Sequence, residues 1–257
     1  MISESRIWGT PPSGFTKLSD GSGNLMIVRQ EHEREISFDI CMNRHGRAAS
    51  SGFYGRGALT TLRLADGENA LVRQYHHGGA LRSFTGEWFF TWPPRPFREL
   101  TITEELRRRG LFTVEVYAAC VSRGAGPFYR GWLVTRELPG AMDLWSALEQ
   151  GLDQRFGVEA AWRAVANTIR SMHGEGVFHG DLNLKNILLR QESTGVAGYV
   201  IDFDKSRLFL GKLPTELAKK NLDRLLRSVR KLDPERRYVP PAAWRQFVDY
   251  YYGSGAA

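Results

Sequence analysis

A polar loop followed by a short apolar run constrains this chain more than any other feature. His179-Gly-Asp-Leu-Asn-Leu-Lys-Asn186 precedes the apolar run, and Val200-Ile-Asp-Phe-Asp204 follows after a turn rich in Ser, Thr and Gly. The apolar stretches have the length and composition of a β-hairpin. Such a hairpin would bring Asp181, Asn186 and Asp202 together at one of its ends, although 21 positions separate the two aspartates.

Two carboxylates and an amide in this pattern are the set that phosphoryl transfer from a nucleotide requires. Asp181 would orient the attacking hydroxyl, and Asn186 and Asp202 would hold Mg²⁺ on the phosphates of ATP. Magnesium prefers hard oxygen ligands, which Asp and Asn supply. The pattern His-x-Asp-x-x-x-x-Asn followed by Asp-Phe-x resembles the catalytic loop and metal loop of the protein-kinase-like fold.

Residues nearer the N-terminus supply candidates for the rest of a nucleotide site. Gly55, Arg56 and Gly57 precede a predicted strand, where a glycine-rich loop that covers phosphates belongs, although a plain turn is the commoner meaning of such glycines. Arg73 lies in the next strand, where most kinases carry a lysine that holds the phosphates and pairs with a helix glutamate. Glu99, which opens a predicted helix, is the natural partner, and an ordinary surface ion pair is the alternative.

Other residues of the loop region indicate what kind of kinase this is. Asn183 follows the proposed base by two positions, where a contact to phosphate or acceptor and a purely structural role are equally open. His179 is expected to shape the loop by packing and hydrogen bonding. Gly180 replaces the arginine that reads a phosphorylated activation loop, and Asp204 replaces a glycine at a cost in backbone freedom. Only 53 residues follow Asp204, so we do not expect a protein loop as the acceptor.

The hydrophobic pattern predicts an α+β chain of two lobes. Residues 1–45 are expected to form an irregular N-terminal arm, residues 46–137 a β-rich N-lobe, and residues 138–257 a reduced, mostly helical C-lobe. The N-lobe should contain a helix at 98–109 and strands at 58–64, 70–75, 114–121 and 131–137. The C-lobe should contain helices at 143–150, 159–173, 215–232 and 241–252.

The excess positive charge is confined to the last fifth of the chain. The formal net charge is +7, and residues 205–257 contain 12 Lys or Arg against 5 Asp or Glu. A basic segment indicates an anionic partner, such as phosphates, an acidic membrane surface or nucleic acid. We expect no nucleic acid partner, because no nucleic-acid-binding motif accompanies the charge.

Cysteine content and hydropathy favour a reducing compartment. Cys41 and Cys120 cannot build a disulfide framework and lack metal-ligand spacing, so both are expected to be small buried residues. Met1–Thr10 has no apolar run behind a basic head, and no segment approaches the ~20 apolar residues of a membrane-spanning helix. We therefore expect a soluble or peripheral protein.

Several motifs resemble the 3-deoxy-D-manno-octulosonic acid (Kdo) kinases, which belong with the lipopolysaccharide core kinases. They cover most of residues 46–232 and comprise Tyr54–Ala58, Val72–Leu81, Arg95–Leu100, His179–Leu189, Ile201–Lys205 and Asn221–Ser228. The resemblance implies a two-lobed protein-kinase-like fold and Mg²⁺-dependent transfer of the ATP γ-phosphate to a hydroxyl of Kdo on a lipid A precursor. It also implies a peripheral place on the cytoplasmic face of the inner membrane of a Gram-negative bacterium. Because the basic segment follows directly after the metal loop, we expect it to face an anionic glycolipid or membrane surface.

Other functions stay open from the residues alone. A lipopolysaccharide core heptose kinase, or another small-molecule kinase, would carry the same motifs. Arg73 in place of lysine invites a pseudokinase, a binding module without transfer, whereas the complete set of Asp181, Asn186 and Asp202 argues against it. Trp88–Trp92 is either an aromatic patch that contacts a membrane or a buried cluster between a loop and a helix.

Overall fold

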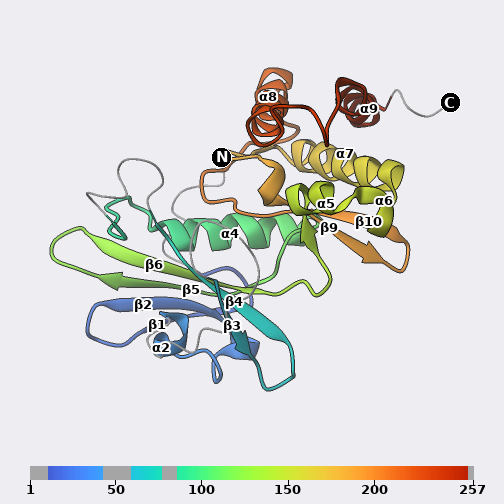
Figure 1. Ribbon diagram of the computed structural model, residues 1–257. Coiled ribbons are helices and arrows are strands. Elements are labelled where there is room, and N and C mark those ends of the chain that lie inside the picture. Colours follow the sequence, from blue (N-terminus) through green and yellow to red (C-terminus); the bar gives the residue numbers. More distant parts are fainter. Residues whose placement is uncertain (1–10, 43–58, 77–85, 254–257) are drawn as a thin grey trace. The chain divides into compact units, whose positions relative to one another are not determined.

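The computed structural model describes residues 11–42, 59–76 and 86–253, which belong to two compact units (Figure 1). The sheet unit comprises Ile2–Glu105 and Val114–Glu137, and the helical unit comprises Leu106–Thr113 and Leu138–Ala257. Strands dominate the first unit and helices the second, so the predicted α+β fold class is confirmed. None of the described helices combines the length and apolar content that crossing a bilayer requires.

The sheet unit is built on a six-stranded antiparallel sheet. In spatial order its strands are β1 (Phe15–Ser19), β2 (Asn24–Arg29), β5 (Val116–Arg123), β6 (Tyr129–Arg136), β4 (Asn69–Gln74) and β3 (Leu59–Arg63). Successive side chains of a strand point to opposite faces. In β2, Met26 and Val28 enter the core on one face while Ile27 enters the core on the other. Both faces of the sheet are therefore covered.

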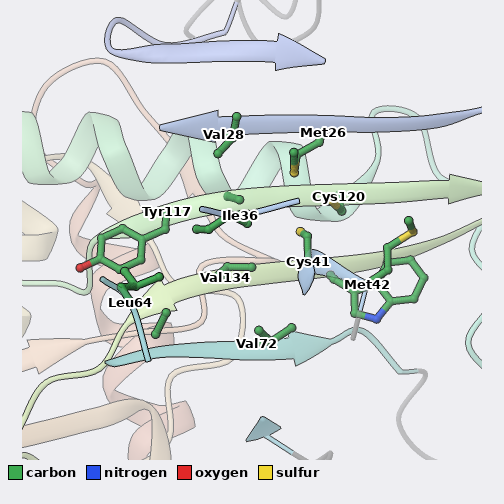
Figure 2. Close-up of a cluster of buried hydrophobic side chains, with 13 residues drawn as sticks. Met26, Val28, Ile36, Cys41, Met42, Leu64, Val72, Tyr117, Cys120 and Val134 are labelled. Atoms are coloured by element: carbon green, nitrogen blue, oxygen red, sulfur yellow. The ribbon is translucent and has the colours of Figure 1, made fainter. Parts of the chain in front are cut away.

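Two hydrophobic clusters cover these faces. In the first (Figure 2), Ile36, Met42 and helix α2 (Phe38–Cys41) pack against the sheet, and Cys41 and Cys120 are buried there as free thiols, as predicted. The second lies against helix α4 (Arg95–Arg108) and includes its residues Phe97 and Leu100. Packing of α4 on the sheet fixes the position of Glu99, which lies one residue before Leu100.

The prediction of an irregular N-terminal arm is wrong for the hairpin formed by β1 and β2. The two strands pair in an antiparallel register and extend the sheet through β5. Residues 20–23, which are rich in Gly and Ser, form the turn of this hairpin, where Asp20 Oδ1 accepts hydrogen bonds from Ser22 N–H at 2.8 Å and from Asn24 N–H at 3.2 Å. The apolar run of β2 lacks the alternation of a half-buried strand because both of its faces are covered.

The other elements predicted for this unit are present with shifted ends. β3 and β4 form the predicted hairpin, with Leu59 opposite Arg73. Helix α4 begins at Arg95, three residues earlier than expected, because Pro94 and Pro96 suit the first turn of a helix and Phe97 N–H donates to the Pro94 carbonyl at 3.1 Å. Strands β5 and β6 each lie two positions or less from their predicted ends.

The helical unit combines helices with two small antiparallel sheets. Its helices are α5 (Leu144–Gln150), α6 (Leu152–Arg155), α7 (Val158–Gly174), α8 (Thr215–Leu232) and α9 (Pro241–Tyr252), with the 3₁₀ turn η3 (Leu184–Asn186). Its sheets are β10 (Gly195–Val200), β9 (Ile187–Glu192) and β7 (Met142–Asp143), and the pair β11 (Arg207–Leu208) and β8 (Val177–Phe178). The four predicted helices are confirmed to within one residue at each end. Helix α7 packs on β10 and α9, which supports the hairpin of β9 and β10.

Candidate active site

The hairpin of β9 and β10 brings the proposed catalytic and metal-binding residues to one of its ends. Its last residue pair is Ile187 and Val200, and just beyond it Ile201 N–H donates to the Asn186 carbonyl at 3.0 Å. The Asn186 side chain turns back to the loop, where its Nδ2 donates to the Asp181 carbonyl at 2.9 Å. The loop is thus hydrogen-bonded to Ile201, the residue directly before Asp202.

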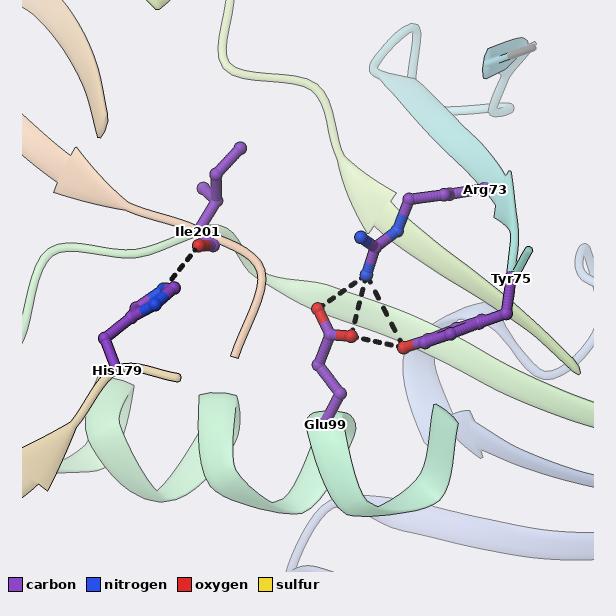
Figure 3. Close-up of polar contacts among 5 residues, drawn as sticks. All are labelled: Arg73, Tyr75, Glu99, His179 and Ile201. Carbon is purple, nitrogen blue, oxygen red and sulfur yellow. Dashed lines mark hydrogen bonds and ion pairs between the residues drawn. The ribbon is translucent and has the colours of Figure 1, made fainter. Parts of the chain in front are cut away.

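His179 connects the loop to the segment before Asp202. Its ring is completely buried, and its Nε2 lies 3.0 Å from the Ile201 carbonyl (Figure 3). Its Nδ1 lies 3.1 Å from the backbone nitrogen of Asp181. These partners assign the neutral tautomer in which Nε2–H donates and Nδ1 accepts. Burial lowers the pKa of His179 below its usual value of 6.5. The predicted role of His179 in shaping the loop is confirmed, since both ring nitrogens are used by the backbone.

The backbone is strained at Asp202, the proposed metal ligand that follows Ile201. Asp202 has a φ of 67°, in the left-handed region that residues other than glycine rarely adopt. Such strain persists only where the surroundings fix it, and it is concentrated at functional sites. Phe203 helps to fix it, because its buried ring lies 5.2 Å from the ring of His179. Asp204 does not share the left-handed conformation, so replacing glycine there costs no backbone strain.

Gly180 marks a close approach of two backbone segments. A Cβ atom at this position would overlap the carbonyl oxygen of Lys205 and lie 2.6 Å from its Cβ. Only glycine lets the two loops pack this closely. A side chain as large as arginine would therefore not fit at this position. This steric reason adds to the one expected from the sequence, that the protein has no phosphorylated activation loop for an arginine to bind.

Asn183 is used by the loop itself. Its Nδ2 donates to the Asp181 carbonyl at 2.8 Å, and its Oδ1 accepts from the Lys185 N–H at 2.9 Å, which caps the turn η3. Both polar groups of the side chain thus have backbone partners. This geometry favours the structural role of Asn183 over a contact to phosphate or acceptor.

Asn221 of helix α8 holds the same loop, a role not predicted from the sequence, where Asn221 is only the first residue of the resemblance motif Asn221–Ser228. Its Oδ1 accepts from the His179 N–H at 3.0 Å, and its Nδ2 donates to the His179 carbonyl at 2.7 Å. The Oδ1 atom also lies 3.1 Å from Nε2 of His173, whose Nδ1 lies 2.8 Å from the Tyr251 hydroxyl. The signal in the sequence is a polar residue on the apolar stripe of a helix, beside Leu222 and Leu225.

The loop-facing side of α8 also includes Ser228 and Arg224. Ser228 Oγ accepts from the Leu184 N–H at 3.2 Å, and Arg224 lies one turn away, between Asn221 and Ser228 on the same face. The Arg224 Nε is buried without a hydrogen-bond partner among the described residues. Arg224 belongs to the basic residues of α8, but it lies on the half-buried side of the helix.

The sheet unit brings Arg73 and Glu99 together, as the sequence predicts. Arg73 Nη2 donates to both carboxylate oxygens of Glu99 at 2.7 Å, and the Tyr75 hydroxyl donates to the same carboxylate (Figure 3). The Glu99 side chain is 3% exposed and the Arg73 side chain 29%, so this is not an ordinary surface ion pair. Glu99 is the fifth residue of α4 and does not open it, because the helix begins earlier than expected. The glycine-rich segment Gly55, Arg56 and Gly57 lies outside the described residues.

Asn186 and Asp202 offer oxygen atoms of the kind that bind a divalent metal ion. The bond from Asn186 Nδ2 to the backbone directs the amide oxygen of this side chain away from Asp181 O, and Asp202 adds a carboxylate. The described residues contain no group of three or more His, Cys, Asp or Glu that could hold a metal by itself. Magnesium commonly takes one or two protein ligands and completes its coordination with water and phosphate oxygens. An amide oxygen and a carboxylate could therefore hold a divalent metal ion that takes its remaining ligands from a nucleotide and water.

Comparison with known proteins gives a consistent result. A model of the lipopolysaccharide kinase (Kdo/WaaP) family matches residues 46–251. The 3-deoxy-D-manno-octulosonic acid kinase of Pasteurella multocida (strain Pm70) is 35% identical over 182 residues, which cover 69% of this chain and 73% of the relative. The enzyme of the same name from Xylella fastidiosa (strain 9a5c) is 33% identical over 207 residues, which cover 79% and 77%.

A solved structure, WaaP in complex with acyl carrier protein, has a TM-score of 0.55 to this chain at 18% identity. The match covers 89% of this chain and 88% of that one. The fold is thus kinase-like, as predicted.

The fold belongs to the kinase-like class, and in it Asn186 is hydrogen-bonded both to the Asp181 carbonyl and to the Ile201 N–H. The chain belongs to the lipopolysaccharide kinase (Kdo/WaaP) family. It is therefore an enzyme of lipopolysaccharide biosynthesis that transfers a phosphoryl group to a sugar hydroxyl, and the predicted family and enzyme class are confirmed. Membership in a kinase family implies the use of ATP, usually with a divalent metal ion.

Proposed function

We propose that this protein transfers the γ-phosphate of ATP to a hydroxyl of Kdo on a lipid A precursor. The observation that carries the proposal is the hairpin end at which Asp181, Asn186 and the segment into Asp202 are tied together. The named Kdo kinases that match more than two thirds of the chain support Kdo as the acceptor sugar. A core heptose kinase is the nearest alternative, and the acceptor experiment below separates the two.

In the proposed mechanism, Asp181 orients the acceptor hydroxyl and takes its proton. The hydroxyl oxygen then bonds to the γ-phosphorus while the bond from that phosphorus to the β–γ bridging oxygen breaks and ADP leaves. Asn186 and Asp202 would hold Mg²⁺, which neutralises charge on the phosphate oxygens when it is bound. His179 and Asn221 act on the reaction only by fixing the loop.

Arg73 is proposed to bind the phosphates from the sheet unit. Glu99 and Tyr75 hold its guanidinium in one orientation, because Nη2 is bonded to both carboxylate oxygens and the ring of Tyr75 lies 5.0 Å from the Arg73 Cζ. A planar guanidinium fork replaces the point charge of the usual lysine and suits phosphate oxygens. We propose that Gly55, Arg56 and Gly57 cover the phosphates in the same complex.

The basic segment at the C-terminus is proposed to face the anionic acceptor. In helix α8 the residues Lys219, Lys220, Arg227 and Arg230 are exposed, whereas the opposite stripe is buried. A lipid A precursor is an anionic glycolipid, and clustered lysine and arginine residues attract anionic lipid surfaces. We propose that the protein works as a peripheral protein on the cytoplasmic face of the inner membrane.

The test is a transfer assay with radiolabelled ATP, Mg²⁺ and three detergent-dispersed lipids. One lipid A precursor carries Kdo, a second lacks it, and the third is a heptose-bearing core lipid. We expect label only in Kdo-bearing lipids, released by treatments that cleave the Kdo linkage. Label on the heptose would support the core heptose kinase, and no label on any lipid despite ATP binding would support a pseudokinase.

A further inference from the structure

The sheet unit exposes three large aromatic side chains in one region of its surface. Phe90 is 69% exposed, Trp92 72% and Phe128 45%. They come from two segments, the loop before α4 and the turn between β5 and β6, and the rings of Phe90 and Phe128 meet edge to face at 6.2 Å. We call these three residues the aromatic patch. A buried cluster, one of the two alternatives for Trp88–Trp92, is therefore wrong for Phe90 and Trp92.

The aromatic patch borders a hollow of about 280 Å³ in the same unit. Side chains of the second hydrophobic cluster, Ile27, Phe97 and Val121, contribute to its lining. Lys17 and Arg123 also line it, both on exposed positions, and the described lining residues include no Asp or Glu. The surface thus combines exposed rings, an apolar hollow and positive charge.

The loop that carries the patch is held firmly by Tyr129. Phe89 and Tyr129 exchange two backbone hydrogen bonds of 2.8 Å, and the Phe89 side chain is buried. The Tyr129 hydroxyl lies 2.7 Å from Thr91 Oγ1 and accepts from the Arg95 N–H at 2.9 Å. Phe90 and Trp92 are therefore presented outward on a loop with fixed neighbours, so their exposure belongs to the folded unit.

We propose that the aromatic patch inserts into the interface of an anionic phospholipid bilayer, with Lys17 and Arg123 contacting the lipid headgroups. Tryptophan and phenylalanine are favoured at the boundary between headgroups and acyl chains, where an apolar ring can be buried. Lysine and arginine near the surface of an anionic membrane add attraction that depends on the lipid charge. The proposal rests on the proposed function, because a lipid acceptor gives the enzyme a reason to bind a bilayer.

The charge of the lining residues favours a membrane over a protein partner. A docking surface for another apolar protein face needs no net charge, whereas a hollow lined by two cations and no described acid complements anionic headgroups. Three protruding rings also suit shallow insertion better than a flat contact.

The test is sedimentation of the whole protein with vesicles of phosphatidylcholine alone or with 30 mol% phosphatidylglycerol, a vesicle composition chosen for the assay. We expect wild type to bind the anionic vesicles at least about tenfold more strongly than the neutral ones. The triple variant Phe90→Ala, Trp92→Ala, Phe128→Ala should lose about tenfold or more of that binding. The matched control is Tyr252→Ala, an aromatic side chain of α9 that is 62% exposed, and it should bind as wild type.

A second pair of variants tests the charges without touching the rings. Lys17→Glu with Arg123→Glu should weaken binding to anionic vesicles and leave the thermal unfolding temperature unchanged, since both residues are exposed. Wild-type binding by the triple variant, or equal binding of wild type to neutral and anionic vesicles, would overturn the proposal. So would a dimer in solution that the triple variant dissociates. Transfer to detergent-dispersed acceptor should persist in all these variants, which separates failure of this proposal from failure of the proposed function.

Discussion

At the scale of single residues, the buried side chain of Asn221 does the most to fix the proposed catalytic loop. It bonds to both the N–H and the carbonyl of His179, and it is completely buried. Removing it leaves buried backbone groups without partners, which costs about 1–3 kcal/mol for each group. The loop therefore depends on a residue that lies 40 or more positions away in the sequence.

We expect Asn221→Ala to lower the free energy of unfolding by about 2–3 kcal/mol. We also expect it to lower kcat, with a smaller effect on the KM for ATP. Asn221→Asp keeps the acceptor but loses the donor, so it should fall between Asn221→Ala and wild type. Urea unfolding and steady-state kinetics measure the two effects. The control is Asn167→Ala, an exposed position of α7. Unfolding free energies that match those of the control would contradict the role assigned to Asn221.

The second prediction concerns Arg73 and its partner carboxylate. Arg73→Ala removes the guanidinium that is hydrogen-bonded to both oxygens of the buried Glu99 carboxylate, and we expect a loss of about 3 kcal/mol in unfolding free energy. Arg73→Lys keeps the charge and should recover most of the stability while raising the KM for ATP, because it loses the planar fork. Denaturant unfolding and ATP kinetics check both. An Arg73→Ala variant with wild-type stability and wild-type ATP kinetics would show that the pair neither stabilises the fold nor helps to bind ATP.

His173 makes the stability of the helical unit depend on pH. Burial lowers its pKa from 6.5 to about 4, and burial lowers the pKa of His179 in the same direction. Between about pH 4 and pH 6.5 His173 is protonated in the unfolded chain but neutral in the folded one. The free energy of unfolding therefore keeps its full value above about pH 6.5 and falls as the pH falls toward 4. For His173 the loss amounts to about 3 kcal/mol. Urea unfolding from pH 7.5 to 4.5 should show this slope. The slope should become shallower in His173→Gln, where only the His179 contribution is left, and should stay unchanged in His76→Gln; equal slopes in the two variants would contradict the assignment.

At the scale of elements, the contact between the two loops depends on Gly180. Gly180→Ala should lower the unfolding free energy by about 1–3 kcal/mol and reduce turnover, because its Cβ would overlap the backbone of Lys205. The matched control is Gly174→Ala at the end of α7, where nothing lies within 4 Å of an added Cβ. Thermal unfolding compares the two variants directly. If Gly180→Ala were as stable as Gly174→Ala, the close approach would not constrain the loop.

Amphipathic elements could be predicted from the sequence because their periodicity is local. Helices α8 and α9 have the predicted ends, and α8 shows why, since its buried stripe recurs at helical spacing. The hairpin of β1 and β2 could not be predicted in this way. Its apolar run is buried on both faces, and its pairing with β1 and with the distant strand β5 identifies it as a strand.

The same distinction applies to the candidate site. Asp181 and Asn186 could be proposed from their spacing, because both lie in one short loop motif. Arg73 could be proposed because its strand occupies the place in the chain where kinases carry a basic residue. Asn221 and the inward position of Arg224 depend on how α8 packs on the loop, which no local pattern specifies. Side chains that hold other residues in place are therefore the part of a site that can be identified only from the three-dimensional structure.

At the scale of the whole molecule, the proposed functions are divided between the two units. Arg73 and Glu99 belong to the sheet unit, and the loop from His179 to Asn186 belongs to the helical unit. The aromatic patch and the exposed basic face of α8 are likewise on different units. In the proposed mechanism Arg73 binds the phosphates and the loop carries out the transfer, so we expect Arg73→Ala to affect mainly the KM for ATP and Asp181→Asn to affect mainly kcat.

The most direct test of the central claim is phosphoryl transfer to the Kdo-bearing lipid by Asp181→Asn and Asp202→Asn, with ATP binding measured in parallel. We expect Asp181→Asn to lower kcat by about 10²–10⁴-fold while Mg²⁺-dependent ATP binding is kept. Asp202→Asn should lose the Mg²⁺ dependence of ATP binding along with turnover, and the exposed control Asp153→Asn should behave as wild type. Wild-type turnover by both Asp181→Asn and Asp202→Asn would contradict the claim that this loop performs the transfer.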